Sequence, residues 1–570
     1  MLISYLVYLV RLVMTIAGNL LRKGLRTPPE YIVFTLYGPY PDLCPPPEGL
    51  LQRRMRPRVK SLQELAEEFR RVAGNPRVKG VVLQLGGLAL PLSRAQALVQ
   101  LIQDLQAQGK EVITWATSYD TRSYLVAAAG NRVLLQQGGI IYALGFAERH
   151  LYFKNALDWC GIELDVVQVS PYKSALERFT RAEMSDEVRE MTTWLMDSYY
   201  GQYLRQVARG RGLEEAQVRA LIEKTPLYGE QAVAAGAVDA VVNAEGLPAF
   251  LGSAAKPATL GSWEQWGWRF SRPLPALPGS YIALLRVQGN IVDGKSRRLP
   301  ARPPLPVPFL FDEQTGDLTF VQQARQALRD RRARGVLLYI DSRGGSASAS
   351  EAMTSSLQQL AARKPLVALM GQIAGSGGYY VATPAAHIVA RPATITGSIG
   401  VIAAKVVNSR LLERLLLNRE TLQRGQADLF FSPEAPFSPQ EREKAWEFIR
   451  HVYDLFIQRV AQGRALEAAA VEQIGAGKVW TGEQALEHGL VDELGGLETA
   501  LAQVRNLAGL PPQTPLVDMP FPRRDVAPPP SGVGWLPYAL DSLARLGGGR
   551  ALLADPLFFH DLDPWPGEEA

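Results

Sequence analysis

Hydrophobic and polar positions follow two alternating periods along most of this chain. Short apolar runs at Tyr31–Gly38, Val78–Leu85 and Glu111–Ala116 predict buried strands. Between these runs, apolar residues recur at helical spacing over Ser61–Val72 and Ser93–Gln108. Strands that alternate with helices in this order predict parallel strand pairing and an α/β fold.

The same pattern starts again about 255 residues later. Tyr281–Gly289 (YIALLRVQG) resembles the first strand, and Arg334–Ile340 (RGVLLYI) resembles Lys79–Leu85 (KGVVLQL), an offset of 334 − 79 = 255. Further on, Thr481–Asp492 (TGEQALEHGLVD) matches Tyr228–Asp239 (YGEQAVAAGAVD), and Gly482 is 253 residues after Gly229. Three matches in the same order predict a tandem duplication of one α/β domain.

The duplication and the composition of the remaining stretches predict five regions. A Pro-, Gly- and Trp-rich join separates the repeats, and a Pro-rich tail follows the second repeat. Within these regions we expect a loop over Pro300–Pro308 and a helix over Leu536–Leu546. The predicted regions are an N-terminal segment (1–27), the first repeat (28–253), a linker (254–279), the second repeat (280–511) and the tail (512–570).

The N-terminal segment is apolar enough to meet a membrane. Leu2–Leu21 is a 20-residue apolar run that contains Arg11 and Asn19, and basic residues follow over 22–26. Its length could span a bilayer, whereas Arg11 near its middle would be costly there. A spanning anchor, a helix in the membrane interface and a buried helix remain open, and no small-residue cleavage site indicates a removed signal peptide. We expect residues 1–27 to associate with the cell membrane.

Composition excludes several other functions. The net charge of +5 is small for 570 residues, and the basic residues are dispersed, so no nucleic-acid partner is expected. The two cysteines, Cys44 and Cys160, form no disulfide framework. Neither lies in a CxxC or Cys/His metal-binding spacing, and we therefore predict no metal and no cofactor.

One glycine-rich turn carries a candidate nucleophile. The apolar run Pro365–Met370 predicts a strand, a helix is expected over Tyr379–Ala386, and Ser376 lies between them in the sequence GQIAGSGGYY. Such a turn exposes a hydroxyl next to free backbone N–H groups, which acyl transfer needs as nucleophile and oxyanion donors. The structural alternative is a glycine-rich turn with an incidental serine.

The two repeats differ where this chemistry is predicted. Ser376 corresponds to about Asp120 in the first repeat, where the glycines are missing. The second repeat also has Asp341–Ser346 (DSRGGS) after its strand, so we expect it to carry the nucleophile and the oxyanion donors. The first repeat instead has Lys173 in SPYKSA, directly after the apolar strand Leu164–Val169.

Lys173 is the predicted general base. A lysine that follows a buried strand is a candidate for desolvation, which lowers the pKa of lysine and allows it to accept a proton, although most lysines are solvated surface charges. Nothing in the sequence singles out a Ser-His-Asp set among the five histidines, and His387, 11 residues after Ser376, is expected to face outward or fill a turn. The residues therefore favour a Ser-Lys dyad.

These motifs together resemble the signal peptide peptidase (protease IV) family. The resemblance rests on GSGGYY, the upstream DSRGGSASASE, the downstream TGSIGV and the lysine segment PYKSALERF, which is similar to that of the long, duplicated form. It covers about Tyr31–Gly509 and implies tandem duplicated crotonase/Clp-protease-like α/β domains. It also implies a membrane-associated serine endopeptidase that degrades released signal peptides, and a homo-oligomer, namely a tetramer.

The resemblance assigns roles to individual residues. By position, Ser376 is the nucleophile, Lys173 is the general base, and Ser398 in TGSIG orients the lysine. The oxyanion hole would use the N–H groups of Gly377 and of Gly345 or Gly344. Arg343 stands where the family commonly has proline.

The expected substrates are signal peptides and other unstructured apolar peptides, bound as an added strand in an apolar groove. Two alternatives remain at this stage. A crotonase-like acyl-CoA enzyme would share the fold and its oxyanion hole without needing the serine or the lysine. A non-catalytic membrane scaffold would keep only the duplicated fold.

Overall fold

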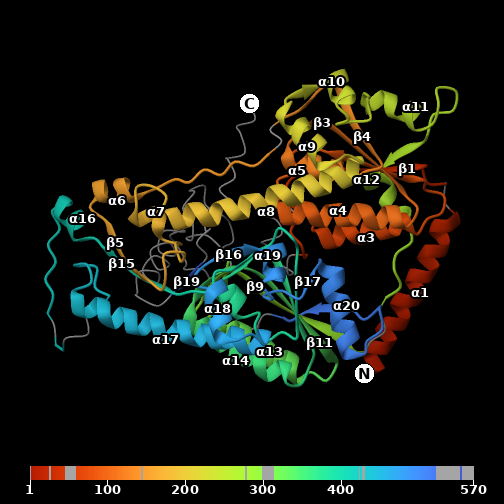
Figure 1. The fold of residues 1–570 in the computed structure, drawn as a ribbon. Helices are drawn as coiled ribbons and strands as arrows, with labels where there is room; N and C mark the ends of the chain where they lie inside the picture. The colour runs from red at the N-terminus through yellow and green to blue at the C-terminus, as the bar shows by residue number, and fades with distance from the viewer. Residues whose placement is uncertain are drawn as a thin grey trace. The chain divides into compact units, whose positions relative to one another are not determined.

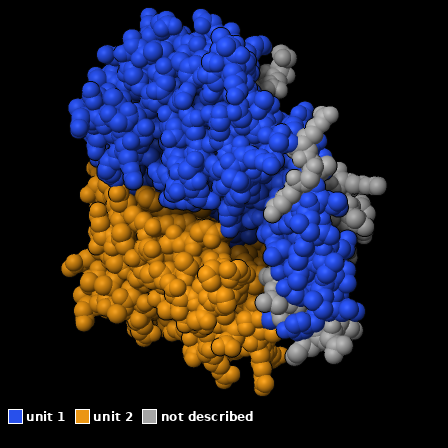
Figure 2. Space-filling model, turned by 90° about the vertical axis from the view of Figure 1, so that its right-hand side faces the viewer, with its two compact units in different colours: residues 1–147, 196–279 blue, residues 148–195, 280–570 orange. Residues whose placement is uncertain are grey.

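The computed structural model describes residues 2–24, 27–44, 59–142, 145–275, 279–297, 313–422, 424–425, 431–520 and 552–554. The chain divides into two compact units, which Figure 2 shows in different colours. Unit 1 consists of residues 1–147 and 196–279, and unit 2 consists of residues 148–195 and 280–570. The segment 148–195, which the sequence analysis includes in the first repeat, therefore belongs to unit 2 and brings Lys173 with it.

Unit 1 contains a seven-stranded sheet in the order β6-β4-β3-β2-β1-β8, with β7 paired to β4. Its centre, β1 to β4, is parallel, as the alternation of strands and helices predicts. The strands are β1 Tyr31–Leu36, β2 Gly80–Leu85, β3 Glu111–Tyr119, β4 Arg132–Ile141, β6 Leu227–Tyr228, β7 Ala240–Val241 and β8 Leu260–Ser262. The helices are α1 Leu2–Gly24, α3 Leu62–Ala73, α4 Leu92–Ala107, α5 Thr121–Ala127, α9 Glu215–Glu223, α10 Gly229–Ala234, η1 Ala244–Gly246, α11 Leu247–Leu251, α12 Trp263–Trp266 and η2 Gly267–Arg269.

Unit 2 contains a larger, mixed sheet whose main path is β16-β14-β12-β11-β19-β15-β5 (Figure 1). Side pairings add β9, β10, β13, β17 and β18. The strands are β5 Glu163–Gln168, β9 Tyr281–Val292, β10 Gln314–Gly316, β11 Ala333–Ser346, β12 Leu366–Gly375, β13 His387–Ala390, β14 Ile395–Gly397, β15 Ile402–Val407, β16 Val479–Thr481, β17 Glu493–Leu494, β18 Leu516–Asp518 and β19 Leu552–Ala554.

The helices of unit 2 pack around this sheet. Alternate residues of β11, namely Val336, Leu338 and Ile340, enter one buried cluster with Phe320 of α13 and Met353 of α14. The helices are α6 Lys154–Cys160, α7 Glu177–Thr180, α13 Asp317–Arg329, α14 Ala347–Ala361, α15 Gly377–Tyr380, α16 Ser409–Arg414, α17 Pro439–Arg464, α18 Ala468–Ile474, α19 Gly482–Glu487 and α20 Leu497–Ala508. One further helix, α8 Asp186–Arg211, contributes residues to both units.

One predicted helix is much shorter than expected. The sequence predicts a helix over Tyr379–Ala386, whereas α15 covers only Gly377–Tyr380 and turns follow it. Pro384 explains the difference, because proline lacks the N–H that a helix needs and disfavours the helical conformation of the residue before it.

Several stretches predicted as linker or tail contain regular structure. Within the expected linker 254–279, β8 pairs with β1, and Trp263 stacks on Phe34 at 5.2 Å. Within the expected tail 512–570, β18 pairs with β9 and β19 pairs with β11. The loop predicted over Pro300–Pro308 and the helix predicted over Leu536–Leu546 lie outside the described residues.

The N-terminal helix α1 is exposed along its length. Within the described part of the chain, α1 is the one helix long and apolar enough to cross a membrane, and its window Tyr5–Arg22 is 0% buried. Leu6, Val13 and Met14 are each more than 60% exposed. Of the three interpretations left open by the sequence, a helix buried in the core does not fit this exposure.

The duplication extends to matched polar contacts inside each unit. Arg211 forms a bidentate ion pair with Asp239 in unit 1, and Arg464 does the same with Asp492 in unit 2, an offset of 464 − 211 = 253. Each arginine also donates to a carbonyl at the same offset, Gly236 or Gly489. The two sheets and these repeated ion pairs agree with the predicted tandem α/β duplication.

We predict that Arg464→Met destabilises unit 2 and leaves unit 1 unchanged. Arg464 is 7% exposed, so its loss leaves the Asp492 carboxylate partly buried without its cation, at a cost of roughly 3 kcal/mol. Hydrogen exchange should accelerate at Ile388, whose N–H donates to Asp492, and not at Val133, whose N–H donates to Asp239. Arg211→Met is the matched control and should give the reverse pattern. Equal acceleration of exchange at Ile388 and Val133 in either variant would contradict the prediction that each ion pair stabilises only its own unit.

Candidate active site

Ser376 lies in a strained turn at the end of β12. Its backbone has φ 55° and ψ −117°, a conformation that non-glycine residues rarely adopt. The turn is held by two backbone hydrogen bonds, from Ser376 N to Gly397 O at 2.9 Å and from Tyr380 N to Ser376 O at 2.8 Å. The predicted strand–turn–helix position of Ser376 is thus observed, but the predicted exposure of its hydroxyl is wrong, because Ser376 is 0% exposed.

The structure brings Lys173, Ser376 and Ser398 together, all within unit 2 and all 0% exposed. Lys173 Nζ lies 2.7 Å from Ser376 Oγ, 2.8 Å from Ser398 Oγ and 2.8 Å from the Ser398 carbonyl oxygen. The first two residues are 203 positions apart in the sequence. Both belong to the same chain, so the contact needs no second subunit.

Ser398 is as constrained as Ser376. It follows β14, has φ 52°, and its N–H donates to the Lys478 carbonyl at 2.7 Å. This conformation turns both its side-chain and its carbonyl oxygen toward Lys173 Nζ. The predicted orienting residue therefore touches the lysine through two oxygens, of which the sequence indicates only the hydroxyl.

Two glycines, to which the sequence analysis assigned no role, pack closely against Lys173 and leave room for it. A Cβ on Gly477 would lie 2.5 Å from Lys173 N and 2.7 Å from its Cα, and a Cβ on Gly400 would lie 3.2 Å from its Cδ. Gly477 also has φ +84°, which disfavours any other residue. The local signal for Gly477 is the glycine-rich sequence GAGK at 475–478.

An aromatic column holds the loop that carries Lys173. Tyr172 stacks on Trp194 at 6.1 Å, Trp194 stacks on Trp480 at 4.9 Å, and the Trp480 ring lies 4.3 Å from that of His488. The Trp194 indole also donates to the Val479 carbonyl. Burial lowers the pKa of His488, which keeps this end of the column neutral near pH 7.

The predicted oxyanion residues lie close to one another. A Cβ on Gly377 would lie 3.2 Å from Gly344 Cα and 3.3 Å from Gly345 N, and a Cβ on Gly378 would lie 2.6 Å from Ser342 O, so the glycines allow α15 to approach β11 closely. The Gly344 N–H donates to Ser342 Oγ at 3.1 Å. Of the two alternatives predicted beside Gly377, Gly345 is therefore the better candidate for an oxyanion donor.

A single strand fills the space between β11 and β15 beside this site. β19 (Leu552–Ala554) lies antiparallel to Gly344–Ser346 of β11, and its Leu552 also pairs with Ile402 of β15. A segment of the chain itself thus takes an extended conformation along the candidate oxyanion loop. The position between β11 and β15 accepts one strand and supplies backbone hydrogen bonds to it.

His387, the alternative base, lies far from Ser376. It pairs with Val367 in the sheet and contacts Glu493 Oε2 at 3.0 Å. Val367 lies nine positions before Ser376 along β12 and the turn that follows it, or roughly 30 Å of extended chain. Among the described residues, no group of three or more His, Cys, Asp or Glu side chains could hold a metal ion.

The sequence profile of Peptidase family S49 matches residues 104–254 and 358–511, once in each predicted repeat. "Serine protease SPPA, chloroplastic" of Arabidopsis thaliana is 28% identical over 496 residues, which cover 83% of this chain and 70% of that protein. "Protease 4" of Salmonella typhi is 29% identical over 472 residues, covering 79% and 72%. "Putative signal peptide peptidase SppA" of Enterococcus faecium is 32% identical over 225 residues, covering 39% and 62%. The two profile matches, one in each repeat, together with an α/β sheet in each unit, confirm the predicted tandem duplication of α/β domains.

We predict that Gly477→Ala slows the reaction of Ser376 with a fluorophosphonate probe at least tenfold. The added methyl group would overlap the Lys173 backbone and displace its amine from the Ser376 hydroxyl. Gly509→Ala is the matched control, because Gly509 has φ +60° and open space around it, so only backbone strain is added. Mass spectrometry of labelled Ser376 gives the rate, and equal rates in the two variants would remove Gly477 from the site.

Proposed function

Because the chain belongs to peptidase family S49 and is a serine peptidase, we propose that Ser376 is its nucleophile and Lys173 its general base. The observation that carries the proposal is the 2.7 Å contact between Lys173 Nζ and Ser376 Oγ in a fully buried setting. A buried amine is desolvated, which disfavours its charged form, and the neutral form can accept the serine proton.

A neutral lysine can also satisfy the three oxygens around Lys173 Nζ. A neutral amine has two N–H donors and one lone pair, whereas an ammonium has three donors and no acceptor. The Ser398 carbonyl can only accept, so one N–H points there, and the second N–H can point at Ser398 Oγ. The lone pair then faces Ser376 Oγ and receives its proton. Ser398 is thus a positioning residue that orients the base.

The reaction proceeds in two steps through an acyl-enzyme. Ser376 Oγ attacks the scissile carbonyl as Lys173 takes its proton, and the N–H groups of Gly377 and Gly345 stabilise the oxyanion. The Lys173 ammonium then protonates the leaving amine and becomes neutral again. A water molecule gives its proton to Lys173 and attacks the ester. Lys173 then passes this proton to Ser376 Oγ as the ester bond breaks, which releases the second product and restores both residues.

We propose that the peptide substrate binds as a strand between β11 and β15, in place of β19. The support is β19, which already lies in this position with antiparallel pairing to Gly344–Ser346. Such binding fixes the substrate backbone next to the oxyanion donors and requires an unfolded segment. Released signal peptides and other unstructured apolar peptides meet this requirement, and they are the proposed substrates.

We further propose that the enzyme is associated with the cell membrane through α1. The exposed apolar surface of α1 supports this location, and a membrane-bound peptidase would meet apolar peptides where they accumulate. A homo-oligomeric, tetrameric assembly remains part of the proposal by resemblance to the family. The acyl-CoA enzyme and the scaffold are not retained, because the family match identifies a peptidase.

We predict that Lys173→Arg is nearly as inactive as Lys173→Ala. Arginine keeps the charge and approximate length but stays protonated, so it cannot accept the serine proton. Both variants should lose roughly 10²- to 10⁴-fold in the rate of casein hydrolysis, as for a lost general base. Ser376→Ala is the nucleophile control and should lose at least as much, with the fold unchanged by circular dichroism. A folded arginine variant with near wild-type turnover would eliminate Lys173 as the base.

We predict that removal of residues 1–25 releases the protein from membranes and retains peptidase activity. The contacts that α1 makes with the rest of unit 1 include hydrogen bonds between Asn19 and Arg272 and from Arg22 to Trp268, each worth about 1 kcal/mol. Unit 2, which holds the dyad, contains no residue of this stretch. Fractionation and casein hydrolysis of the truncated protein are the measurements. Retention in the membrane fraction would mean that α1 is not the anchor.

A further inference from the structure

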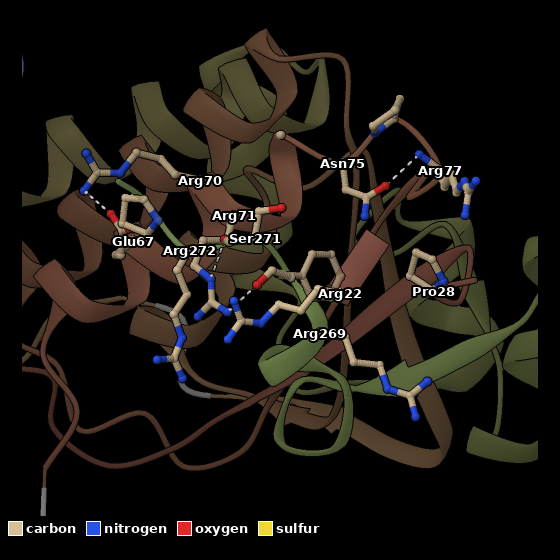
Figure 3. A pocket seen from close by; sticks show the side chains of 14 residues that line it. Arg22, Pro28, Glu67, Arg70, Arg71, Asn75, Arg77, Arg269, Ser271 and Arg272 are labelled. Carbon is tan, nitrogen blue, oxygen red and sulfur yellow. Dashed lines mark hydrogen bonds and ion pairs between the residues drawn. The ribbon is translucent and has the colours of Figure 1, made fainter. Parts of the chain in front are cut away.

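A strongly basic pocket of about 630 Å³ lies in unit 1 beside the C-terminal end of α1. Fourteen residues line it, and Glu67 is the one acidic residue among them (Figure 3). Six lining residues are arginines: Arg22, Arg70, Arg71, Arg77, Arg269 and Arg272. Such an excess of guanidinium groups favours an anion, and the planar fork of arginine suits phosphate oxygens in particular.

The arginines at the centre of the pocket are positioned but not neutralised. Arg71 donates to the carbonyl groups of Gly267, Phe270 and Ser271, and Arg22 donates to the Trp268 carbonyl. These carbonyls orient the side chains without supplying negative charge. Figure 3 shows the guanidinium groups of Arg22 and Arg71 beside each other. Burial and then the nearby charge of Arg272 lower the pKa of Arg71, as expected where positive charges crowd together.

Arg269 has hydrogen-bonding capacity to spare. Its guanidinium group lies 4.3 Å from the Trp266 ring and 4.9 Å from the Trp268 ring, so its plane is fixed by stacking. Its Nε and Nη1 atoms are buried and have no hydrogen-bond partner among the residues that the structure describes. A buried donor without an acceptor is costly, and the oxygens of a bound phosphate group would satisfy it.

The pocket is joined to the apolar helix. The Asn19 side chain and the Arg272 backbone exchange two hydrogen bonds of 2.9 Å, and Arg22 belongs to the last turns of α1. Leu20 and Leu21, directly before Arg22, are 64% and 74% exposed. Exposed apolar side chains therefore lie within about one helical turn, roughly 5 Å, of Arg22.

We propose that this pocket binds the phosphate group of an anionic phospholipid headgroup while α1 contacts the acyl chains. The shared chemistry is a phosphate anion, and the adjoining apolar helix favours a lipid over free phosphate as its source. The site anchors unit 1 at a fixed depth relative to the membrane surface. It rests on the proposed membrane association of α1, which binding to neutral vesicles tests separately.

The test measures binding of the full-length protein to vesicles of phosphatidylcholine alone and of phosphatidylcholine with 30 mol% phosphatidylglycerol. The pocket variant is Arg77→Gln with Arg272→Gln, both exposed residues whose side chains hold no part of the core. The control variant is Arg209→Gln with Arg219→Gln, which removes the same charge from exposed positions of unit 1 outside the pocket. Each protein is also titrated with inorganic phosphate by calorimetry without vesicles.

We expect the wild-type protein and the control variant to prefer the anionic vesicles, and the pocket variant to bind them roughly 10- to 30-fold more weakly than the wild type. Binding to neutral vesicles should be the same for all three, since it depends on α1. Equal losses in the pocket and control variants would overturn the proposal in favour of general charge attraction. Phosphate binding that depends on the pocket, without any preference for anionic vesicles, would overturn the lipid assignment. If the wild-type protein does not bind neutral vesicles, the proposed membrane association of α1 is itself refuted.

Discussion

The antiparallel pairing of β5 with β15 is the constraint on which the active site depends. Gln168, the last residue of β5, pairs with Ile402, the first residue of β15. Lys173 lies five residues after Gln168, and Ser398 lies four residues before Ile402. The register of this pairing therefore brings Lys173 to Ser398. A slip of two residues would move Lys173 by roughly 7 Å, well beyond hydrogen-bond distance. Polar contacts of Asp165 with Arg442 and with the Phe437 N–H oppose such a slip.

Local sequence predicts the strands and the reactive groups better than it predicts their assembly. Apolar periodicity indicates the central strands of both units, and the glycines around Ser376 indicate the turn, because both signals arise from neighbouring residues. The pairing of 163–168 with a strand some 240 residues later leaves no local signal, so the sequence alone does not show that segment 148–195 belongs to unit 2. Gly477 was missed for the same reason, since its importance depends on Lys173 packing against it.

The two repeats share structural polar contacts but differ in the residues of the candidate active site. Both retain the Arg–Asp pair and a buried tyrosine, Tyr124 or Tyr379, that donates to a carbonyl 111 to 113 residues later. Among the described residues, only unit 2 has serines, Ser376 and Ser398, in the positive-φ region, a conformation that costs roughly 1–3 kcal/mol each. The surrounding sheet offsets the energy of this strained backbone. The strained conformation in turn holds the oxygens of Ser376 and Ser398 against Lys173 Nζ.

The long separation of β5 from β15 has a consequence for the nascent chain. Gln168 leaves the ribosome 402 − 168 = 234 residues before its partner Ile402. At about 5–20 residues per second, β5 waits roughly 10 to 50 s for the strand that pairs with it. During that interval Lys173 has no Ser376 to contact, and when Ser376 emerges, β15 has still to follow. Under the proposed mechanism, the order of translation therefore keeps the peptidase inactive until most of its own unfolded segments have been made and can fold.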